Sequence, residues 1–486
     1  MRALVWFRAD LRTLDNAALC QASKASDGGV VALFVISPGQ WKQHDYAPAR
    51  VDLMLRTLAE LSRSLGQYNI ALKIRMAKRM ADVPGVVAAA MKEFACDALY
   101  YNKEYEVDEV RRDEKTAEMV KQASAKVFAQ TDQCLIEPGE VRTGEGKFFT
   151  VYSPFKRASY KYFAKEGGVR EYAMPKKQHG MVGTADAVPT SVDGFESSVD
   201  AAHWPGGETY ALKQLRSFAE KQIVPYKATR DFPGTRGTSM LSPYLAIGAI
   251  SPRQCIVAAV QANTLAAKSN TSPFESGPEG ITHWISEVLW REFYIHILVG
   301  FPRVCMHRAF QPTTESILWN DNAKHLEAWK LGRTGLPIVD AGMRQLREMG
   351  WMHNRVRMIV AMYFTKNLFL DWRLGEKFFM QNLVDGFLAS NNGGWQWSAS
   401  TGTDAAPYFR VFNPLTQSQK FDSDGTYIRR FVPELRDVEG DAIHEPWTIP
   451  GLLRSRVDYP EPMVDLSKTR ERAIEAFRDI KGVNAT

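Results

Sequence analysis

The sequence predicts two folds in one chain: an α/β domain built on a doubly wound parallel sheet, followed by an all-α domain. The first prediction rests on five short apolar runs that alternate with longer amphipathic stretches over the first 130 residues. The second rests on long helical patterns, with few strand signals, from about residue 206 onward. A chain of 486 residues is long enough for two or three domains.

The five expected strands are rich in Val, Ile, Phe and Tyr, as strands buried on both faces of a sheet usually are. They are ALVWF (3–7), VVALFVI (30–36), ALKIRM (71–76), DALYYN (97–102) and KVFAQ (126–130). Between them, residues 51–65 show the 3.6-residue period of a helix. This alternation predicts helices on both faces of a parallel sheet. No GxGxxG follows the first strand, so the usual dinucleotide fingerprint is missing.

The chain is expected to change character near residue 205. Residues 165–205 are rich in Gly, Pro, Ser and charge and show no sustained periodicity. Helical patterns follow at 210–223, 281–300, 333–350 and 353–370. We therefore assign residues 1–135 to the α/β domain, 136–205 to an inter-domain connection and 206–486 to the helical domain.

Composition excludes several classes of protein. Hydrophobic residues make up 45% and charged residues 24%, as in globular proteins. The apolar run 30–36 is far shorter than the roughly 20 residues of a membrane span. Arg8, Asp10 and Arg12 interrupt the apolar region that a signal peptide needs, so we expect a cytoplasmic protein without membrane partners. The five cysteines contain no CxxC and the nine histidines are scattered, which predicts no metal site.

Three segments indicate chemistry. The TSMLS segment (238–242) places hydroxyl residues ahead of a helix, which favours either an anion site or an ordinary helix cap. In the helix around 284–294, Trp284, Glu287 and Arg291 share one face, with Trp290 beside them. That face predicts a polar pocket wall with a flat indole, or equally a surface ion pair beside a core tryptophan.

The third segment, residues 385–414, packs two asparagines, two glycines and two tryptophans into seven positions. Glycines there would let the backbone approach a ligand closely, and the alternative is a Gly-rich turn with buried indoles. Arg357 opens an apolar run and needs an acidic or phosphate partner, for which Asp385 is a candidate. Because no nucleophilic triad is visible, we expect a cofactor to carry the reaction.

Seven motifs follow one another along nearly the whole chain. They are LVWFRADLRTLDNAAL (4–19), RDFPGTRGTSMLSPYLAIGAISPR (230–253), EVLWREFY (287–294), TGLPIVDAGMRQL (334–346), GWMHNRVRM (350–358), NNGGWQWSASTGTDAAPYFRVFNP (391–414) and HEPW (444–447). In these motifs the chain resembles the photolyase/cryptochrome family, and most closely the bacterial class I photolyases of cyclobutane pyrimidine dimers. The resemblance implies an antenna domain, a helical FAD-binding domain and light-driven repair of pyrimidine dimers in damaged DNA. It also implies a carbon–carbon lyase that acts as a monomer.

The resemblance assigns the cofactor positions. It implies that FAD is bound by Tyr226, Thr238, Ser239, Met240, Leu241, Ser242, Trp284, Arg291, Arg357, Asp385, Gly386, Phe387 and Asn391. Asp385 would pair with Arg357, and Asn391 would lie beside the flavin N5. Trp319 at the surface, Trp372 between and Trp395 near the ring would relay electrons to the flavin.

The resemblance also assigns lesion and DNA contacts. Arg230, Glu287, Trp290, Tyr294, Asn354, Arg355, Met358, Trp397 and Gln417 are the implied positions. Trp290 and Trp397 would clasp the flipped dimer while Glu287 stabilises its radical anion, after photoexcited reduced FAD has passed it an electron. Extruding the damaged pair costs a few kcal/mol, and stacking at about 1–3 kcal/mol per base offsets much of it; photolyases are themselves among the standard examples of base flipping.

Departures from the family pattern leave alternatives open. Phe387 stands where relatives carry the second Asp of DGD, so polar flavin contacts expected there are in doubt. Asp108 stands where folate-binding relatives tend to carry Asn, and Met306 follows Cys305 where a Lys is common, while Glu109 is kept. The antenna chromophore implied at Asp108, Glu109 and Cys305 is 5,10-methenyltetrahydrofolate, with a deazaflavin or none as alternatives. A cryptochrome-type photosensor is a rival function. Repair of (6-4) photoproducts is another, but Met358 stands where such enzymes commonly carry a second histidine besides His353.

Overall fold

The computed structural model describes residues 1–264, 268 and 271–483. The chain forms two compact units, each made of several segments. Unit 1 contains Met1–Val224, Ser239–Pro302 and Val384–Phe387, and unit 2 contains Pro225–Thr238, Arg303–Leu383 and Leu388–Thr486. The helices expected after residue 206 are therefore shared by the two units, while the domain boundaries at 135 and 205 stay a prediction.

Unit 1 carries a five-stranded, all-parallel sheet in the order β3-β2-β1-β4-β5. The strands are β1 (Ala3–Phe7), β2 (Val30–Ile36), β3 (Ala71–Met76), β4 (Ala98–Asn102) and β5 (Lys126–Gln130). In register, Leu4 stands between Val31 and Leu99. The predicted doubly wound α/β fold is confirmed, and four of the five strands have the predicted bounds.

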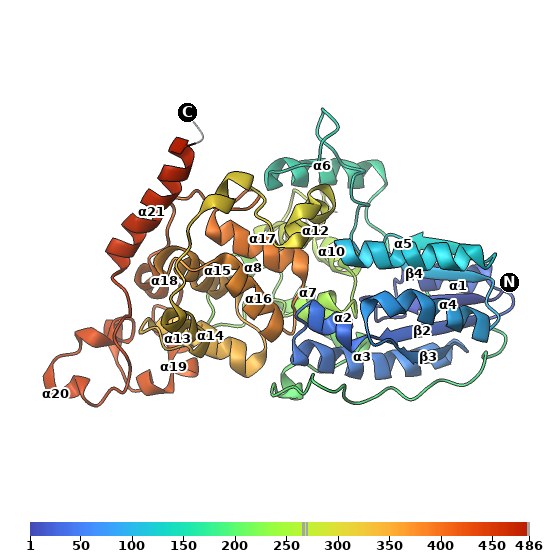
Figure 1. Ribbon diagram of the computed structural model, residues 1–486, viewed down its shortest axis with the longest axis horizontal. Coiled ribbons are helices and arrows are strands. Elements are labelled where there is room, and N and C mark those ends of the chain that lie inside the picture. Colours follow the sequence, from blue (N-terminus) through green and yellow to red (C-terminus); the bar gives the residue numbers. More distant parts are fainter. Residues whose placement is uncertain (265–267, 269–270, 484–486) are drawn as a thin grey trace. The chain divides into compact units, whose positions relative to one another are not determined.

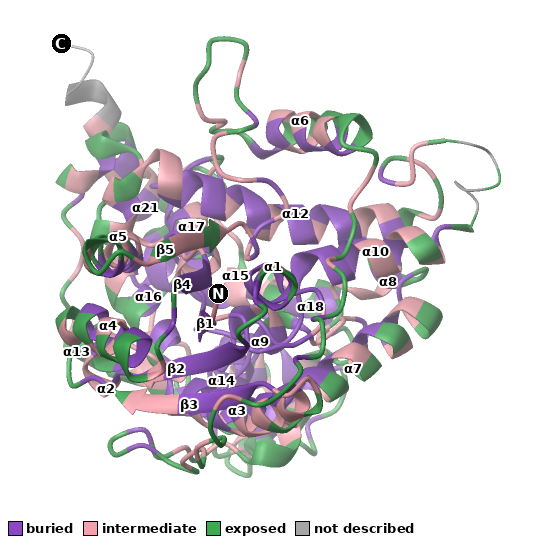
Figure 2. Ribbon diagram, turned by 90° about the vertical axis from the view of Figure 1, so that its right-hand side faces the viewer, coloured by how far each residue is buried: buried purple, intermediate pink, exposed green. Residues whose placement is uncertain are grey.

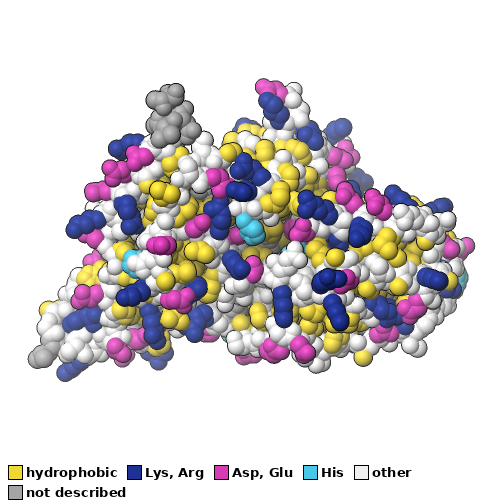
Figure 3. Space-filling view, viewed as in Figure 1, with side chains coloured by type: hydrophobic (Ala, Val, Ile, Leu, Met, Phe, Trp, Pro, Cys, Tyr) yellow, Lys and Arg dark blue, Asp and Glu magenta, His cyan; other side chains and the backbone are white. Residues whose placement is uncertain are grey.

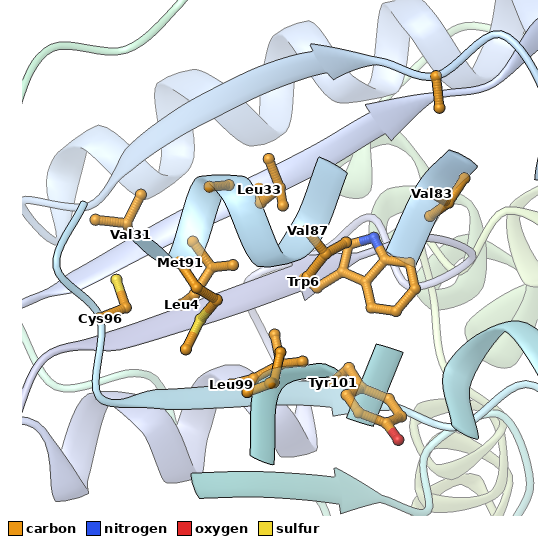
Figure 4. Packing of buried hydrophobic residues seen from close by; sticks show 13 residues of the cluster. Leu4, Trp6, Val31, Leu33, Val83, Val87, Met91, Cys96, Leu99 and Tyr101 are labelled. Atoms are coloured by element: carbon orange, nitrogen blue, oxygen red, sulfur yellow. The ribbon is translucent and has the colours of Figure 1, made fainter. Parts of the chain in front are cut away.

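Helices cover this sheet and bury its apolar side chains. They are α1 (Ala17–Ala25), α2 (Pro38–Gln43), α3 (Pro48–Gln67), α4 (Val83–Glu93) and α5 (Val107–Gln122). Figure 4 shows Leu4, Leu33 and Leu99 from the strands packed with Val87 and Met91 of α4. Continuous apolar strands fit this arrangement because both faces of the sheet are covered. The burial colours of Figure 2 mark β1 and β2 as part of this core.

The rest of unit 1 is helical. It contains α6 (Tyr152–Lys165), α7 (Glu208–Lys221), α9 (Ser242–Ala246), α10 (Pro252–Ala262) and α12 (Glu279–Gly300). Helix α12 packs against α6 and α10. Helix α6 lies in the stretch expected to be a connection, whereas residues 166–200 contain no helix or strand, as their lack of periodicity predicted.

Buried charges link the helices of unit 1 to its sheet. Arg253 at the start of α10 donates to Asp15 at 3.0 Å and to Asp132 at 2.6 Å. Arg12, after β1, donates to the same Asp132 at 2.6 Å. Two guanidinium groups share two carboxylates here, so the buried charges are compensated within the cluster.

The described elements of unit 2 are helices (Figure 1). These are α8 (Tyr226–Thr229), α13 (Ala323–Leu331), α14 (Pro337–Met349), α15 (Asn354–Met362), α16 (Trp372–Asn382), α17 (Leu388–Ala399), α18 (Pro414–Phe421), α19 (Thr426–Phe431), α20 (Gly451–Arg454) and α21 (Leu466–Val483). The pattern at 353–370, expected as one helix, continues after α15 as a π-helical turn, Tyr363–Asn367.

The asparagine- and glycine-rich segment forms helix α17 rather than a turn. This is a low-propensity sequence for a helix, so tertiary packing of its tryptophans must hold it. On the face of the molecule that Figure 3 shows, basic and acidic side chains are interspersed. The net charge of +6 therefore forms no single basic patch on that face.

Candidate functional site

The predicted pocket wall on α12 belongs to unit 1. Trp284 is buried and packs against Phe218 with ring centres 5.0 Å apart. Glu287, one turn on, is half-buried, and His283 lies 3.5 Å from its carboxylate. The aliphatic Ile285 and Leu289 are fully buried on other sides of the helix. The helix therefore buries its aliphatic residues and leaves a partly accessible polar row, as the spacing predicted.

Arg291 completes this row in an unusual environment. Its Nη1 donates to the backbone oxygen of Gln133 at 2.6 Å. Its guanidinium carbon lies 4.6 Å from the ring centre of Phe387. Burial lowers the pKa of Arg291 below its ordinary value. Among the described residues Arg291 forms no salt bridge, and its bond to Gln133 uses one of its five N–H donors.

Trp290 is fixed by a residue that sequence reasoning missed. Its indole stacks on the ring of Tyr152 from α6, with centres 3.7 Å apart and planes 11° from parallel. The Tyr152 hydroxyl lies 2.6 Å from both the backbone oxygen and the Oγ of Ser286. Tyr294 packs against the same indole at 5.7 Å. One face of the Trp290 indole is thus covered by Tyr152.

The TSMLS segment is a tight loop before α9. Met240 has φ +54°, a left-handed conformation that is uncommon outside glycine. The N-cap of α9 is Leu241, which makes no side-chain cap, so the expected capping hydroxyls are not used for that purpose. In unit 2, a Cβ at Gly237 would lie 2.4 Å from the oxygen of Thr229, so this position requires glycine. The strained backbone of this loop suits a ligand contact.

Tyr226, predicted to contact the same ligand, starts α8 in unit 2 and is buried. The guanidinium of Arg230 lies 5.5 Å from the centre of its ring. Thr238 belongs to unit 2 and Ser239, Met240, Leu241 and Ser242 to unit 1.

Asn391 on α17 has a defined amide orientation. Its Nδ2 donates to the backbone oxygen of Glu376 on α16 at 2.9 Å. Only the nitrogen can donate to a carbonyl, so the contact fixes Oδ1 as the free, neutral acceptor. The neighbouring Asn392 is buried and donates to Val304 and Glu376 instead. The predicted partner of the flavin therefore presents an oxygen without charge.

Two of the three predicted relay tryptophans, Trp372 and Trp395, lie at α16. Trp372 is its first residue and is fully buried. Trp395 of α17 packs on Gly375 so closely that a Cβ there would lie 2.2 Å from the indole. Trp319 is partly exposed and packs on Phe369 at 5.1 Å, while the next residue pairs with Leu370 in a β-bridge. Burial thus decreases from Trp372 and Trp395 to Trp319, as a path to the surface requires.

Helix α15 presents three predicted lesion contacts, with Asn354 exposed and Arg355 and Met358 partly exposed. Arg357 donates to the backbone oxygen of Met352 at 2.7 Å. Its predicted partner Asp385 is buried and belongs to unit 1, with Gly386 and Phe387, so the Arg357–Asp385 pair stays a prediction.

His353 caps α15, because its Nδ1 accepts from the backbone N–H of Arg355 at 3.2 Å. Burial lowers the pKa of His353 from 6.5 to about 4, and nearby arginines add to this, outweighing the opposite pull of Asp231. The buried imidazole is therefore neutral at pH 7, and its Nδ1 caps the first turn of α15.

We expect acid to destabilise the protein through His353. The unfolded residue titrates near 6.5 and the folded one near 4, so its contribution is complete above pH 6.5 and is lost as pH falls through 4. The loss amounts to about 3 kcal/mol. The variant H353N keeps a capping acceptor and does not titrate, so its denaturation midpoint should fall less between pH 6.5 and 4. Identical pH profiles for both proteins would contradict this.

The other predicted DNA-facing residues lie in unit 2. Trp397 packs against Phe412 with ring centres 6.5 Å apart. Arg355 forms a salt bridge of 2.9 Å with Asp231, which also lies 3.6 Å from Arg230. Gln417 on α18 is partly exposed.

The predicted antenna position is an acidic cluster at the start of α5. Glu109 is buried and accepts from His44 Nδ1 at 2.9 Å and from Gln40 at 3.1 Å, while Asp108 lies 3.6 Å from His44 Nε2. Burial opposes charge on His44, but the contacts with Glu109 and Asp108 raise its pKa overall. Sequence reasoning did not anticipate His44. Cys305 belongs to unit 2 and is partly exposed.

Doubly wound sheets usually bind ligands where the strand order reverses, which here lies between β1 and β4. The cavity at that point measures only about 40 Å³, because side chains including Trp6, Arg8 and Tyr46 fill it. Within the ranges described, no group of three or more His, Cys, Asp or Glu side chains is suited to a metal ion. No helix in those ranges is both long and apolar enough to cross a bilayer.

Each unit offers groups that fit a flavin nucleotide. In unit 1, Arg291 offers N–H groups and Trp284 a flat apolar wall. In unit 2, Asn391 offers a neutral oxygen. Such groups suit a ligand that carries both an anionic phosphate and a flat ring.

Comparison with known proteins matches this chain along its length. Residues 3–175 match a family model described as DNA photolyase, and residues 284–479 match one described as the FAD binding domain of DNA photolyase. The deoxyribodipyrimidine photo-lyase of Escherichia coli (strain K12) is 41% identical over 475 residues, which are 98% of each chain.

Solved structures agree with these matches. A bacterial class III photolyase from Agrobacterium tumefaciens has a TM-score of 0.86 and 35% identity, over 99% of this chain and 98% of that one. A cryptochrome from Synechocystis sp. PCC6803 also has a TM-score of 0.86, with 26% identity, over 98% of this chain and 99% of that one.

Proposed function

Because the chain belongs to the DNA photolyase family, with its FAD-binding domain, we propose that it repairs cyclobutane pyrimidine dimers in DNA with light. The structural observation that carries the proposal is the Trp290 indole, clamped on one face by Tyr152. A rigid stacking surface suits recognition of flipped bases. The proposed enzyme is a carbon–carbon lyase.

In this proposal FAD, when bound and reduced, supplies under illumination the electron that splits the dimer. Arg291 donates N–H groups to the cofactor, and Asn391 presents its neutral Oδ1 to the ring. Trp284 covers an apolar face of the cavity. The Arg291 guanidinium lies over the Phe387 ring instead of pairing with a carboxylate. Its positive charge therefore favours an anionic group of the cofactor nearby.

We propose that the lesion contacts have different chemical roles. Trp290 and Trp397 stack on the two bases, and Asn354 and Met358 contact their edges. Glu287 hydrogen-bonds the dimer and stabilises the charge that develops on it, an electrostatic role. These contacts offset the few kcal/mol that extrusion of the bases costs.

The tryptophan arrangement supports an electron relay through Trp395, Trp372 and Trp319. Trp372 is the first residue of α16, and the indole of Trp395, from α17, packs on Gly375 one turn later. Trp319 is partly exposed, where it can be re-reduced from solution. Rings held in a packed core keep fixed separations.

The cluster of Asp108, Glu109 and His44 is proposed to bind 5,10-methenyltetrahydrofolate as a second chromophore. The family resemblance adds Cys305 to the residues expected to contact it. The filled crevice between β1 and β4 argues against a deazaflavin there. We further propose a cytoplasmic monomer acting on damaged DNA.

The proposal is tested with an oligonucleotide that contains one thymine dimer. Reduced protein under blue light should restore intact thymines, and the same mixture in the dark should not. The match to a cryptochrome supports a photosensor as the second candidate. A persistent dimer under illumination, with FAD bound and reduced, would overturn repair and favour the sensor.

A further inference from the structure

Unit 2 contains a surface depression in which two predicted DNA-facing residues, Arg355 and Gln417, stand beside aromatic side chains that no assigned role explains. It has a volume of about 470 Å³, within the range of small-molecule sites. It lies between the loop after α8, the first turn of α15, and α18. Its lining includes Phe232, Arg355, Phe412, Gln417, Lys420 and Phe421.

The walls of the depression are aromatic. Phe232 and Phe421 meet edge to face with centres 6.3 Å apart, and Phe232 is 39% exposed. Phe412, on another side, packs against Trp397 at 6.5 Å. Phe412 therefore connects the depression to Trp397, which is predicted to stack on the lesion. An exposed phenylalanine in such a wall offers a surface on which a flat group can stack.

The rim is basic. Lys227 and Lys420 are exposed there, and Lys420 Nζ lies 5.1 Å from the ring centre of Phe421. The one acidic residue of the lining, Asp231, forms a salt bridge of 2.9 Å with Arg355 and lies 3.6 Å from Arg230. Its charge is compensated, so the depression as a whole attracts an anion.

Two polar groups of the lining have unused hydrogen-bonding capacity. Gln417 Oε1 and Arg355 Nε are buried and have no hydrogen-bond partner among the described residues. The amide of Gln417 offers both a donor and an acceptor, the pair that a base edge requires. Arg355 is held over Phe421 at 4.4 Å and by Asp231, so it is positioned without a bound ligand.

We propose that this depression binds one unpaired DNA base beside the dimer, with the phosphate of that nucleotide on the rim lysines. Flat rings, cations and an amide together are the elements by which proteins hold single-stranded nucleic acid. The proposal rests on the proposed repair function, since flipping a dimer out of the duplex leaves the bases opposite it without pairing partners. The base comes either from the opposite strand or from the nucleotide flanking the dimer.

The test compares F232A with wild type by measuring affinity for dimer-containing DNA, in duplex and in single-stranded form. Loss of one stacking contact of about 1 kcal/mol predicts an affinity loss of about fivefold or more. A loss confined to the duplex identifies the opposite strand as the source, and a loss on both forms identifies the flanking nucleotide. F232W should retain binding, because it keeps a flat ring.

The control is F409A, which removes another exposed phenylalanine of unit 2 that does not line the depression. Its affinity should equal that of wild type. Equal affinity of F232A and wild type on both DNA forms would overturn the inference, as would an equal loss in F409A. Wild-type repair of the dimer under light would show that the proposed function survives either result. Q417A, expected to weaken binding as well, provides a second variant if F232A does not fold.

Discussion

Replacing Gly375 by alanine should destabilise unit 2 by about 2 kcal/mol and displace the Trp395 indole. A Cβ at this position would lie 2.2, 2.4 and 2.8 Å from three atoms of the six-membered ring of that indole. The ring cannot retreat, because Phe364, Phe379 and Trp329 surround it with centres 5.0 to 6.1 Å away. Overpacking costs about 1–3 kcal/mol, and the gain in helix propensity offsets up to about 1 kcal/mol.

Thermal unfolding and near-ultraviolet circular dichroism measure both effects. The matched control is G85A in α4, where an added Cβ meets no atom within 4 Å, so a small stabilisation is expected. In the background W395F, which lacks the clashing ring atoms, G375A should cost much less. If G375A destabilises the protein equally in both backgrounds, the indole is not what excludes a side chain at this position.

The same variant tests the proposed relay. The Trp395 indole packs on Gly375 of α16, so the added methyl group should displace it. This displacement should slow the light-driven reduction of bound oxidised FAD. G85A, which has no contact with the relay, should leave that rate unchanged. A normal rate in G375A, together with a displaced indole, would contradict the role of this packing in electron transfer.

The strands were predictable because their cause is local. Each of β1, β2, β3 and β5 is a short run of apolar and β-branched residues that ends where the pattern ends. In a sheet covered on both faces, such runs have few alternative structures.

The remaining features depend on contacts distant in sequence. Tyr152 stacks on a residue 138 positions away, and nothing around Tyr152 itself indicates a partner. Helix α17 forms from a sequence with poor helix propensity, because Trp395 is fixed by rings from α13 and α16 and from the π-helical turn. That turn, Tyr363–Asn367, escaped prediction because its apolar pattern is close to that of an α-helix. Without the family resemblance, most site residues would have been only polar residues on helices.

Replacing Trp290 by alanine should weaken binding of dimer-containing DNA by roughly 5- to 150-fold, the equivalent of about 1–3 kcal/mol of stacking. Binding to undamaged DNA should stay nearly unchanged, because it depends on phosphate contacts and salt. Titrations with both DNAs at several salt concentrations measure the difference.

The clamp makes a further distinction possible. Y152L removes the ring that covers one face of Trp290 but leaves the lesion-facing indole in the protein. Without its support the indole gains freedom that lesion binding must then remove, so we expect an intermediate loss of affinity, about 1 kcal/mol or about fivefold. Combined with W290A, the same substitution should add almost nothing, since the ring it positions is already absent. If the two losses instead add, or if W290A weakens binding to damaged and undamaged DNA equally, Trp290 contacts the backbone or the fold rather than the dimer.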